Sequence, residues 1–101
     1  MDQIERITHF EEILDKANQV HRELEDALSR FSGIQADLRA LNAYYTGADW
    51  RQDFRDDEAG LLPRDLKRGV LSEDAAYDTL TENRELLTRM LETVTEVLKA
   101  Q

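Results

Sequence analysis

The stretch "ITHFEEILDKANQVHRELEDAL", residues 7–28, decides the fold, because its apolar residues recur at the spacing of an α-helix. Three heptad series run through it, and two of them continue, one to residue 41 and the other to residue 45. They are Ile7, Leu14 and Leu28; Phe10, Ala17, Leu24, Phe31, Leu38 and Tyr45; and Ile13, Val20, Ala27, Ile34 and Leu41. Together they form an apolar stripe wider than the seam of a two-stranded coiled coil, which is typical of a helix packed in a bundle.

The first helix is predicted to span residues 3–46. Gly33 complicates this prediction, because Gly can end a helix and the neighbouring Ser32 and Gln35 can cap a new one. The second and third apolar series nevertheless pass Gly33 without a change of register. The pattern therefore favours one long helix, with room for a kink at Gly33, and a full break there is the alternative.

A second long helix is predicted over residues 72–100. Ser72 is a good N-cap, and the carboxylates of Glu73 and Asp74 follow in the first turn, where the helix dipole favours negative charge. Apolar residues then recur at heptad spacing: Tyr77, Leu80, Leu87, Leu91, Val94 and Leu98.

The connection between these helices, residues 47–71, is predicted to be a structured lid. It has too many apolar residues for a free loop, namely Trp50, Phe54, Leu61, Leu62, Leu66, Val70 and Leu71. Pro63 can begin a short helix and Gly69 can end it, which predicts a helix near residues 63–68, and residues 49–55 are expected to form another helical turn. A small second core is expected to fasten the lid to the end of the first helix. Its members are Tyr44, Tyr45, Trp50 and Phe54.

The lengths of the helices suggest how they pair. At about 1.5 Å per residue the first helix is about 65 Å long and the second about 40 Å. The second is therefore expected to run antiparallel along residues 5–32, while the lid covers residues 34–46. The predicted fold is all-α: one domain, residues 1–101, built as an antiparallel helical bundle of two long helices with a structured helical lid between them.

Two apolar stripes of this width cannot both be buried in one helix–helix contact. The sequence therefore favours a homodimer in which two chains associate into a four-helix bundle. A three-helix bundle, formed if the first helix breaks at Gly33, is the alternative.

Composition limits the partners. The chain has 101 residues, with 13 Lys and Arg against 22 Asp and Glu, a net charge of −9. Such a field repels phosphate backbones and anionic headgroups, so neither nucleic acid nor a membrane surface is an expected partner. The absence of cysteine excludes thiolate catalysis and cysteine-based metal sites. No signal-peptide or membrane-span pattern occurs, so the expected location is the cytoplasm.

Three polar residues interrupt the apolar stripes. His21 lies on the stripe of the first helix, and Asn83 with Arg84 interrupts the stripe of the second. The antiparallel pairing brings them to one level, which predicts a polar layer that fixes the register of the bundle. A ligand or proton-handling site is the alternative.

Carboxylates are dense at the start of the lid, at Asp49, Asp53, Asp56, Asp57 and Glu58. Such oxygens suit calcium, magnesium or manganese, but their spacing lacks the alternating ligands and internal Gly of an EF-hand loop. No nucleophile elbow or phosphate-binding glycine loop is present either. The sequence therefore predicts no catalytic residue, no metal site and no cofactor.

Three segments carry a resemblance to a known family: "YYTGADWRQDF" (residues 44–54), "LPRDLKRGVLSEDAAYDTL" (62–80) and "ENRELLTRML" (82–91). They contain the motifs YYxGxxWxxD and LPxxLxRGVLSED. By them the chain resembles a small bacterial family of uncharacterised proteins, classified as a domain of unknown function. The resemblance implies a bacterial, cytoplasmic, helical protein and brings no established activity.

The lid is also the expected binding surface, because aromatic and arginine side chains make efficient binding anchors. The candidate binding residues are Tyr44, Tyr45, Trp50, Asp53, Arg68, Glu73 and Asp74, with Arg68 expected in a charged network with Asp53, Glu73 and Asp74. The predicted function is a non-enzymatic helical interaction or ligand-binding module acting through residues 44–74. Two alternatives stay open: a small metal-dependent or hydrolytic enzyme that uses the lid carboxylates, and an acidic antagonist of a basic protein.

Overall fold

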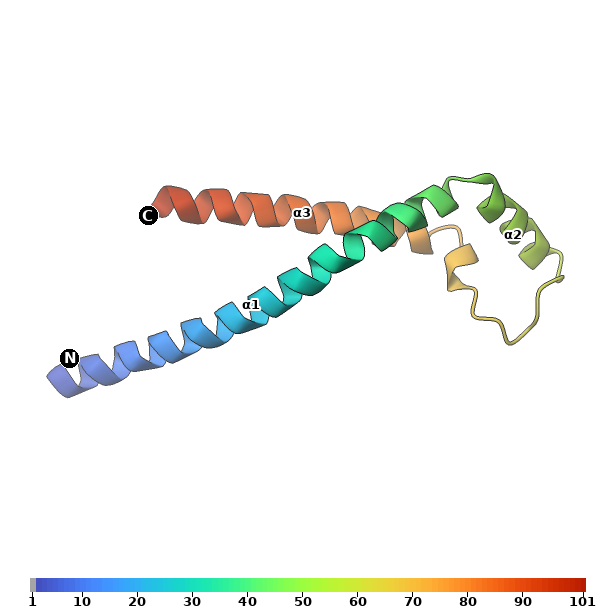
Figure 1. Ribbon diagram of the computed structural model, residues 1–101. Coiled ribbons are helices and arrows are strands. Elements are labelled where there is room, and N and C mark those ends of the chain that lie inside the picture. The colour runs from blue at the N-terminus through green and yellow to red at the C-terminus, as the bar shows by residue number, and fades with distance from the viewer. Residues whose placement is uncertain (1) are drawn as a thin grey trace. The chain divides into compact units, whose positions relative to one another are not determined.

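The computed structural model describes residues 2–101, which form three α-helices, one short 3-10 helix and no strand (Figure 1). The elements are α1 (Gln3–Tyr45), α2 (Ala48–Glu58), η1 (Gly69–Leu71) and α3 (Ala75–Ala100). The all-α class with two long helices is confirmed. None of the helices described is long and apolar enough to cross a membrane.

Helix α1 begins at an N-cap and continues through Gly33 without interruption. The Oδ1 atom of Asp2 accepts a hydrogen bond from the Glu5 backbone N–H at 2.8 Å, which satisfies one of the free donors of the first turn. The alternative of a full break at Gly33 is therefore wrong. One glycine costs a helix only about 1 kcal/mol, and the apolar series on both sides favour the same register.

The chain divides into two compact units, Met1–Ala36 and Asp37–Gln101. The described part of the first unit is α-helix from Gln3 onward, and its large apolar side chains other than Phe31 are exposed. The expected single domain and the antiparallel pairing with residues 5–32 stay predictions.

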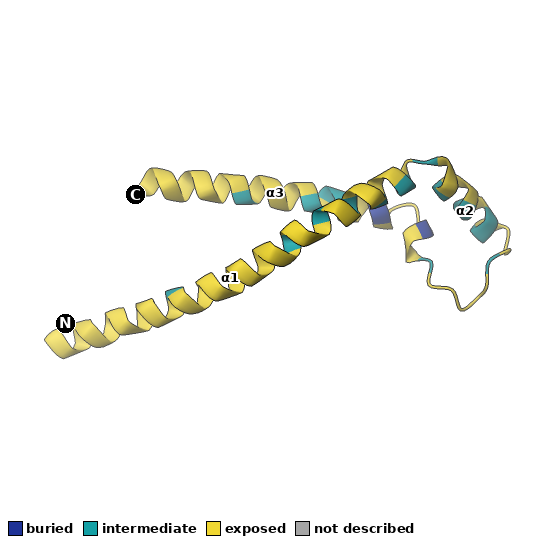
Figure 2. Cartoon of the chain, viewed as in Figure 1, coloured by how far each residue is buried: buried dark blue, intermediate teal, exposed yellow. Residues whose placement is uncertain are grey.

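The second unit holds the buried residues of the chain. Helix η1 packs against both α2 and α3. Leu71 in η1 is 5% exposed and Ala76 in the first turn of α3 is 3% exposed, and no other residue of the described chain is classed as buried (Figure 2). The core is therefore small and lies where the lid meets the start of α3.

The turn between α1 and α2 requires a glycine. The backbone N–H of Gly47 donates a hydrogen bond to the Tyr44 carbonyl oxygen at 3.0 Å. A Cβ atom at Gly47 would lie 2.9 Å from the carbonyl oxygen of Ala43, a distance that real Cβ contacts do not show. This close approach lets α2 begin at Ala48, with only two residues between it and the end of α1 at Tyr45.

Helix α2 ends in a glycine cap. Gly60 has φ of 74°, in the left-handed region, and its N–H donates to the Asp57 carbonyl at 3.0 Å. The Leu61 N–H donates to the Asp56 carbonyl at 2.9 Å, which completes the hydrogen-bond pattern of a Schellman motif. The expected single turn over residues 49–55 is thus an eleven-residue helix with a defined end.

The short helix predicted near residues 63–68 is wrong. In that segment the Leu66 N–H donates to the Pro63 carbonyl at 3.2 Å, which makes a turn, and the helical residues come later, at Gly69–Leu71. A helix of six residues gains few backbone hydrogen bonds for the cost of nucleation, so side-chain contacts decide the path of such a segment.

The start of α3 differs from the prediction by three residues. The helix begins at Ala75 rather than residue 72. The Ser72 hydroxyl oxygen still accepts a hydrogen bond from the Ala75 N–H at 3.2 Å, as the N-cap interpretation requires.

Candidate functional site: the lid and its exposed loop

Three aromatic rings hold α2 against the end of α1. Trp50 stacks on Phe54 with a centroid distance of 5.1 Å and an interplanar angle of 16°. Tyr45 meets Trp50 edge to face, also at 5.1 Å. Aromatic pairs in these geometries add stabilisation beyond the area that they bury. The structure therefore brings together Tyr45, Trp50 and Phe54 of the expected second core.

The polar groups of two of these rings form hydrogen bonds with the backbone near the C-terminal end of the lid. The Trp50 indole N–H donates to the Val70 carbonyl oxygen at 2.9 Å. The Tyr45 hydroxyl donates to the Glu73 carbonyl oxygen at 3.0 Å. Both acceptors are backbone atoms outside α-helices, so the two side chains fix η1 and the approach to α3 in place.

Tyr44 bonds to α2 through its hydroxyl group. This group donates to the Oδ2 atom of Asp53 at 2.6 Å, a short charge-assisted hydrogen bond. That bond, together with desolvation and the negative charges of Asp53 and Asp49, raises the pKa of Tyr44 from 10.0 to about 12. Tyr44 therefore stays protonated in the folded chain at pH values where a free tyrosine ionises.

Replacement of Tyr44 by Phe is expected to destabilise the chain in a pH-dependent way. The loss of the hydrogen bond costs about 1–2 kcal/mol below pH 10. Because the folded pKa lies above the unfolded one, the wild-type advantage is complete below pH 10 and disappears as the pH rises through about 12. Urea midpoints of wild type and Tyr44→Phe, measured from pH 8 to 12, should converge.

The matched control for this experiment is Tyr77→Phe, which removes the same hydroxyl group from a side chain that is 58% exposed. It should leave the urea midpoint near the wild-type value at pH 8. A constant gap between wild type and Tyr44→Phe across the whole pH range would contradict the role given to the Tyr44–Asp53 bond.

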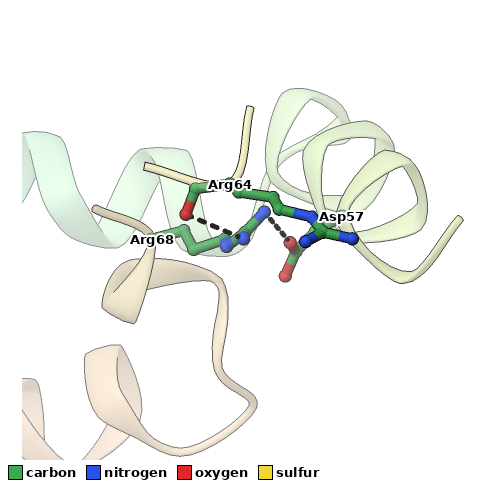
Figure 3. A network of polar contacts seen from close by, with 3 residues as sticks. All are labelled: Asp57, Arg64 and Arg68. Atoms are coloured by element: carbon green, nitrogen blue, oxygen red, sulfur yellow. Dashed lines mark hydrogen bonds and ion pairs between the residues drawn. The ribbon is translucent and has the colours of Figure 1, made fainter. Parts of the chain in front are cut away.

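Arg68 anchors the loop that follows α2. Its Nη1 atom donates to Oδ1 of Asp57 at 2.9 Å, and Nη2 donates to the Arg64 carbonyl oxygen at 3.5 Å (Figure 3).

The charged network predicted for Arg68, with Asp53, Glu73 and Asp74, is wrong in its partners. The Gly60 cap turns the chain back over the end of α2, which brings Arg68 to Asp57. The Asp53 carboxylate accepts from Tyr44, and Glu73 contributes its backbone oxygen.

The lid loop, defined here as residues 59–71, exposes three large apolar side chains. Leu61 is 71% exposed, Leu66 is 48% exposed and Val70 is 38% exposed. Arg64 and Lys67 are exposed between them.

This exposed surface was not predicted from the sequence, because all apolar residues of the lid were expected to pack. A signal was present in the charges: in a chain of net charge −9, residues 61–71 hold three cations and one carboxylate.

One comparison with known proteins identifies the chain. The model of the family described as "Domain of unknown function (DUF4298)" matches residues 7–93. The chain belongs to this family. No curated protein and no solved structure matches the chain. In this DUF4298 chain the matched range takes in the aromatic cluster of Tyr45, Trp50 and Phe54, the Arg68–Asp57 pair and the whole lid loop.

The remaining predicted site residues of the DUF4298 chain lie on α1, on α3 and directly before α3. His21 is exposed on α1, while Asn83 is half-buried and Arg84 is exposed on α3. Asp74 precedes the first residue of α3. The polar layer of His21, Asn83 and Arg84 stays a prediction, as does a binding role for the seven candidate binding residues.

The carboxylates of α2 are used mainly in local contacts. Asp53 accepts from Tyr44, Asp57 from Arg68, and Asp56 from the side chain of Gln52 at 2.9 Å. Within residues 2–101, no group of three or more His, Asp and Glu side chains is arranged to hold a metal ion.

Proposed function

We propose that this chain is a non-enzymatic protein-interaction module that binds its partner through the lid loop. One observation carries the proposal: the lid loop is held in place by side-chain contacts and still exposes Leu61, Leu66 and Val70. A plain connection between two helices needs neither feature, whereas functional loops are commonly presented by a rigid scaffold. We also propose that the protein is bacterial and cytoplasmic, as the resemblance implies.

The contacts that hold the lid loop favour tight binding. Trp50 bonds to the backbone of Val70, Arg68 bonds to Asp57, and the Gly60 cap sets the direction of the chain. A loop that is ordered before it binds loses less conformational entropy on association. Tyr44, Tyr45, Trp50 and Arg68 then act as positioning residues for the loop.

The chemistry of the lid loop defines the partner. Leu61, Leu66 and Val70 offer apolar contacts, and Arg64 and Lys67 place positive charges among them. At physiological salt, charges more than about 8 Å away are largely screened, so a docked partner responds to the local excess of positive charge that Arg64 and Lys67 give over the exposed Asp65, rather than to the net charge of −9. The partner is therefore a protein surface of apolar side chains flanked by carboxylates.

The double variant Leu61→Ser, Leu66→Ser is expected to weaken partner binding by about 2 kcal/mol, roughly thirtyfold, because both apolar anchors are removed. Affinity capture from the native bacterium, followed by titration of the captured partner, measures the loss. The matched control is Ile4→Ser, since Ile4 is 76% exposed and lies far from the lid loop in sequence. Circular dichroism should show the same helix content for all three chains.

The charge of the partner is tested with Arg64→Glu, Lys67→Glu. This variant should lose binding, whereas Arg89→Glu, Lys99→Glu makes the same change in net charge on α3 and should retain it. Equal recovery of every captured protein by wild type and by both lid-loop variants would show that this loop is not the recognition surface.

A further inference from the structure

We infer that the apolar face of α1 is covered by a second copy of this chain. The α1 face is defined by Ile7, Phe10, Ile13, Leu14, Val20, Leu24, Leu28 and Ile34. The inference goes beyond the proposed function, because none of these residues belongs to the lid loop. It rests on the exposure, the charge pattern and the area of the face.

The exposure of the α1 face shows that it needs a cover. Its eight side chains are 43% to 58% exposed. Among residues 2–30, only Ala17 is even half-buried. In proteins, most of the stability of a helix comes from the packing of its amphipathic face, and the described part of the Met1–Ala36 unit contains no second element to supply that packing.

The charges around the face suit an identical partner. The three apolar series contain no Asp or Glu between residues 7 and 34, and His21 is their only polar member there. The six carboxylates of this stretch, at Glu11, Glu12, Asp15, Glu23, Glu25 and Asp26, all lie at other helix positions. Two copies can therefore meet through the face without placing carboxylate against carboxylate, in spite of a charge of −9 each. A basic partner would find no counter-charge within the face.

The apolar area available agrees with a dimer. Helix α3 has a matching exposed face, formed by Tyr77, Leu87, Leu91, Val94, Val97 and Leu98. A fully exposed large apolar side chain loses about 80 Å² of apolar surface on burial, so a half-exposed one still offers about 40 Å², and the fourteen together offer about 550 Å² per chain. A standard interface buries about 800 Å² per partner, somewhat more than half of it apolar.

The number of faces also agrees with a dimer. Each chain carries two apolar faces, so a pair of chains brings four, which is the number that a four-helix bundle buries. Closed two-fold assembly is the commonest arrangement of identical chains, and in it both chains contribute the same surface to the interface. His21 then lies in the interface, where a single polar residue sets the register at some cost in affinity.

Light scattering during size-exclusion chromatography at about 50 μM tests the inference. Wild type is expected to have twice the monomer mass of 11.7 kDa. Leu24→Glu, which places a carboxylate in the α1 face, is expected to halve the mass. The matched control Gln19→Glu adds the same charge on the opposite side of the helix and should stay dimeric. A wild-type mass of 11.7 kDa with intact helix content, or equal dissociation of both variants, would overturn the inference.

A second variant guards against the possibility that Leu24→Glu simply unfolds. His21→Leu makes the stripe wholly apolar and should lower the dimer dissociation constant about tenfold. An unchanged or raised constant would remove His21 and its face from the interface. The double variant Leu61→Ser, Leu66→Ser should keep the dimer mass, so failure of the lid-loop proposal and failure of this inference are separate results.

Discussion

Trp50→Ala is expected to lower the free energy of lid unfolding by about 3 kcal/mol, because the loss of a packed aromatic ring is one of the costliest single changes. The variant removes the stack on Phe54 and the edge contact with Tyr45. It also leaves the Val70 carbonyl oxygen without the indole donor that it now has. Trp50 is half-buried rather than fully buried, which keeps the expected cost near the lower end for such substitutions.

Hydrogen exchange read by mass spectrometry measures this loss locally. The backbone amides of Leu71 in η1 and of Ser72 directly after it donate to the carbonyls of Arg68 and Gly69, and these hydrogen bonds break when the lid opens. Peptides that cover residues 69–75 should exchange about a hundredfold faster in Trp50→Ala, since 1.4 kcal/mol corresponds to a factor of ten.

Two comparisons make the Trp50 experiment specific. Trp50→Phe keeps an aromatic ring beside Phe54 and loses the indole N–H, so it should cost about 1 kcal/mol. Peptides from residues 7–28 should exchange at the wild-type rate in both variants. Wild-type protection of residues 69–75 in Trp50→Ala would mean that the aromatic cluster does not hold the lid.

The long helices were predictable because their signal repeats many times. Fourteen apolar residues at helical spacing indicate that α1 is a helix, and its predicted range of 3–46 differs from the observed Gln3–Tyr45 by one residue. The aromatic cluster was predictable for a related reason, since Tyr45, Trp50 and Phe54 are too close in the chain and too apolar to be left in a loop. Repetition and local density are properties that a sequence shows directly.

The path of the lid loop was not predictable, because it depends on contacts between residues far apart in the chain. The ion pair of Arg68 with Asp57 forms only after the Gly60 cap has turned the backbone, and several other carboxylates were equally plausible partners. Composition also does not tell which apolar residues of a short segment are buried. Leu61 and Leu71 look alike in the sequence, yet one is 71% exposed and the other 5%.

Leu71→Ala is expected to lower the free energy of unfolding by about 3 kcal/mol, because it opens a cavity in the small buried core. Leu71 is the one large apolar side chain in residues 2–101 that is buried, and η1 packs there against both α2 and α3. Few neighbouring atoms are available to refill the space. Urea unfolding followed by the fluorescence of Trp50, the only tryptophan, reports on this region at equal protein concentrations.

Leu66→Ala is the matched control for Leu71→Ala, since it makes the same substitution in the same lid loop at a side chain that is 48% exposed. It should cost less than about 1 kcal/mol. The comparison also bears on function, because a side chain kept for recognition contributes little to the stability of the free chain. Equal costs for the two variants would mean that Leu66 packs as Leu71 does, and the exposed apolar surface assigned to the lid loop would lose one of its three anchors.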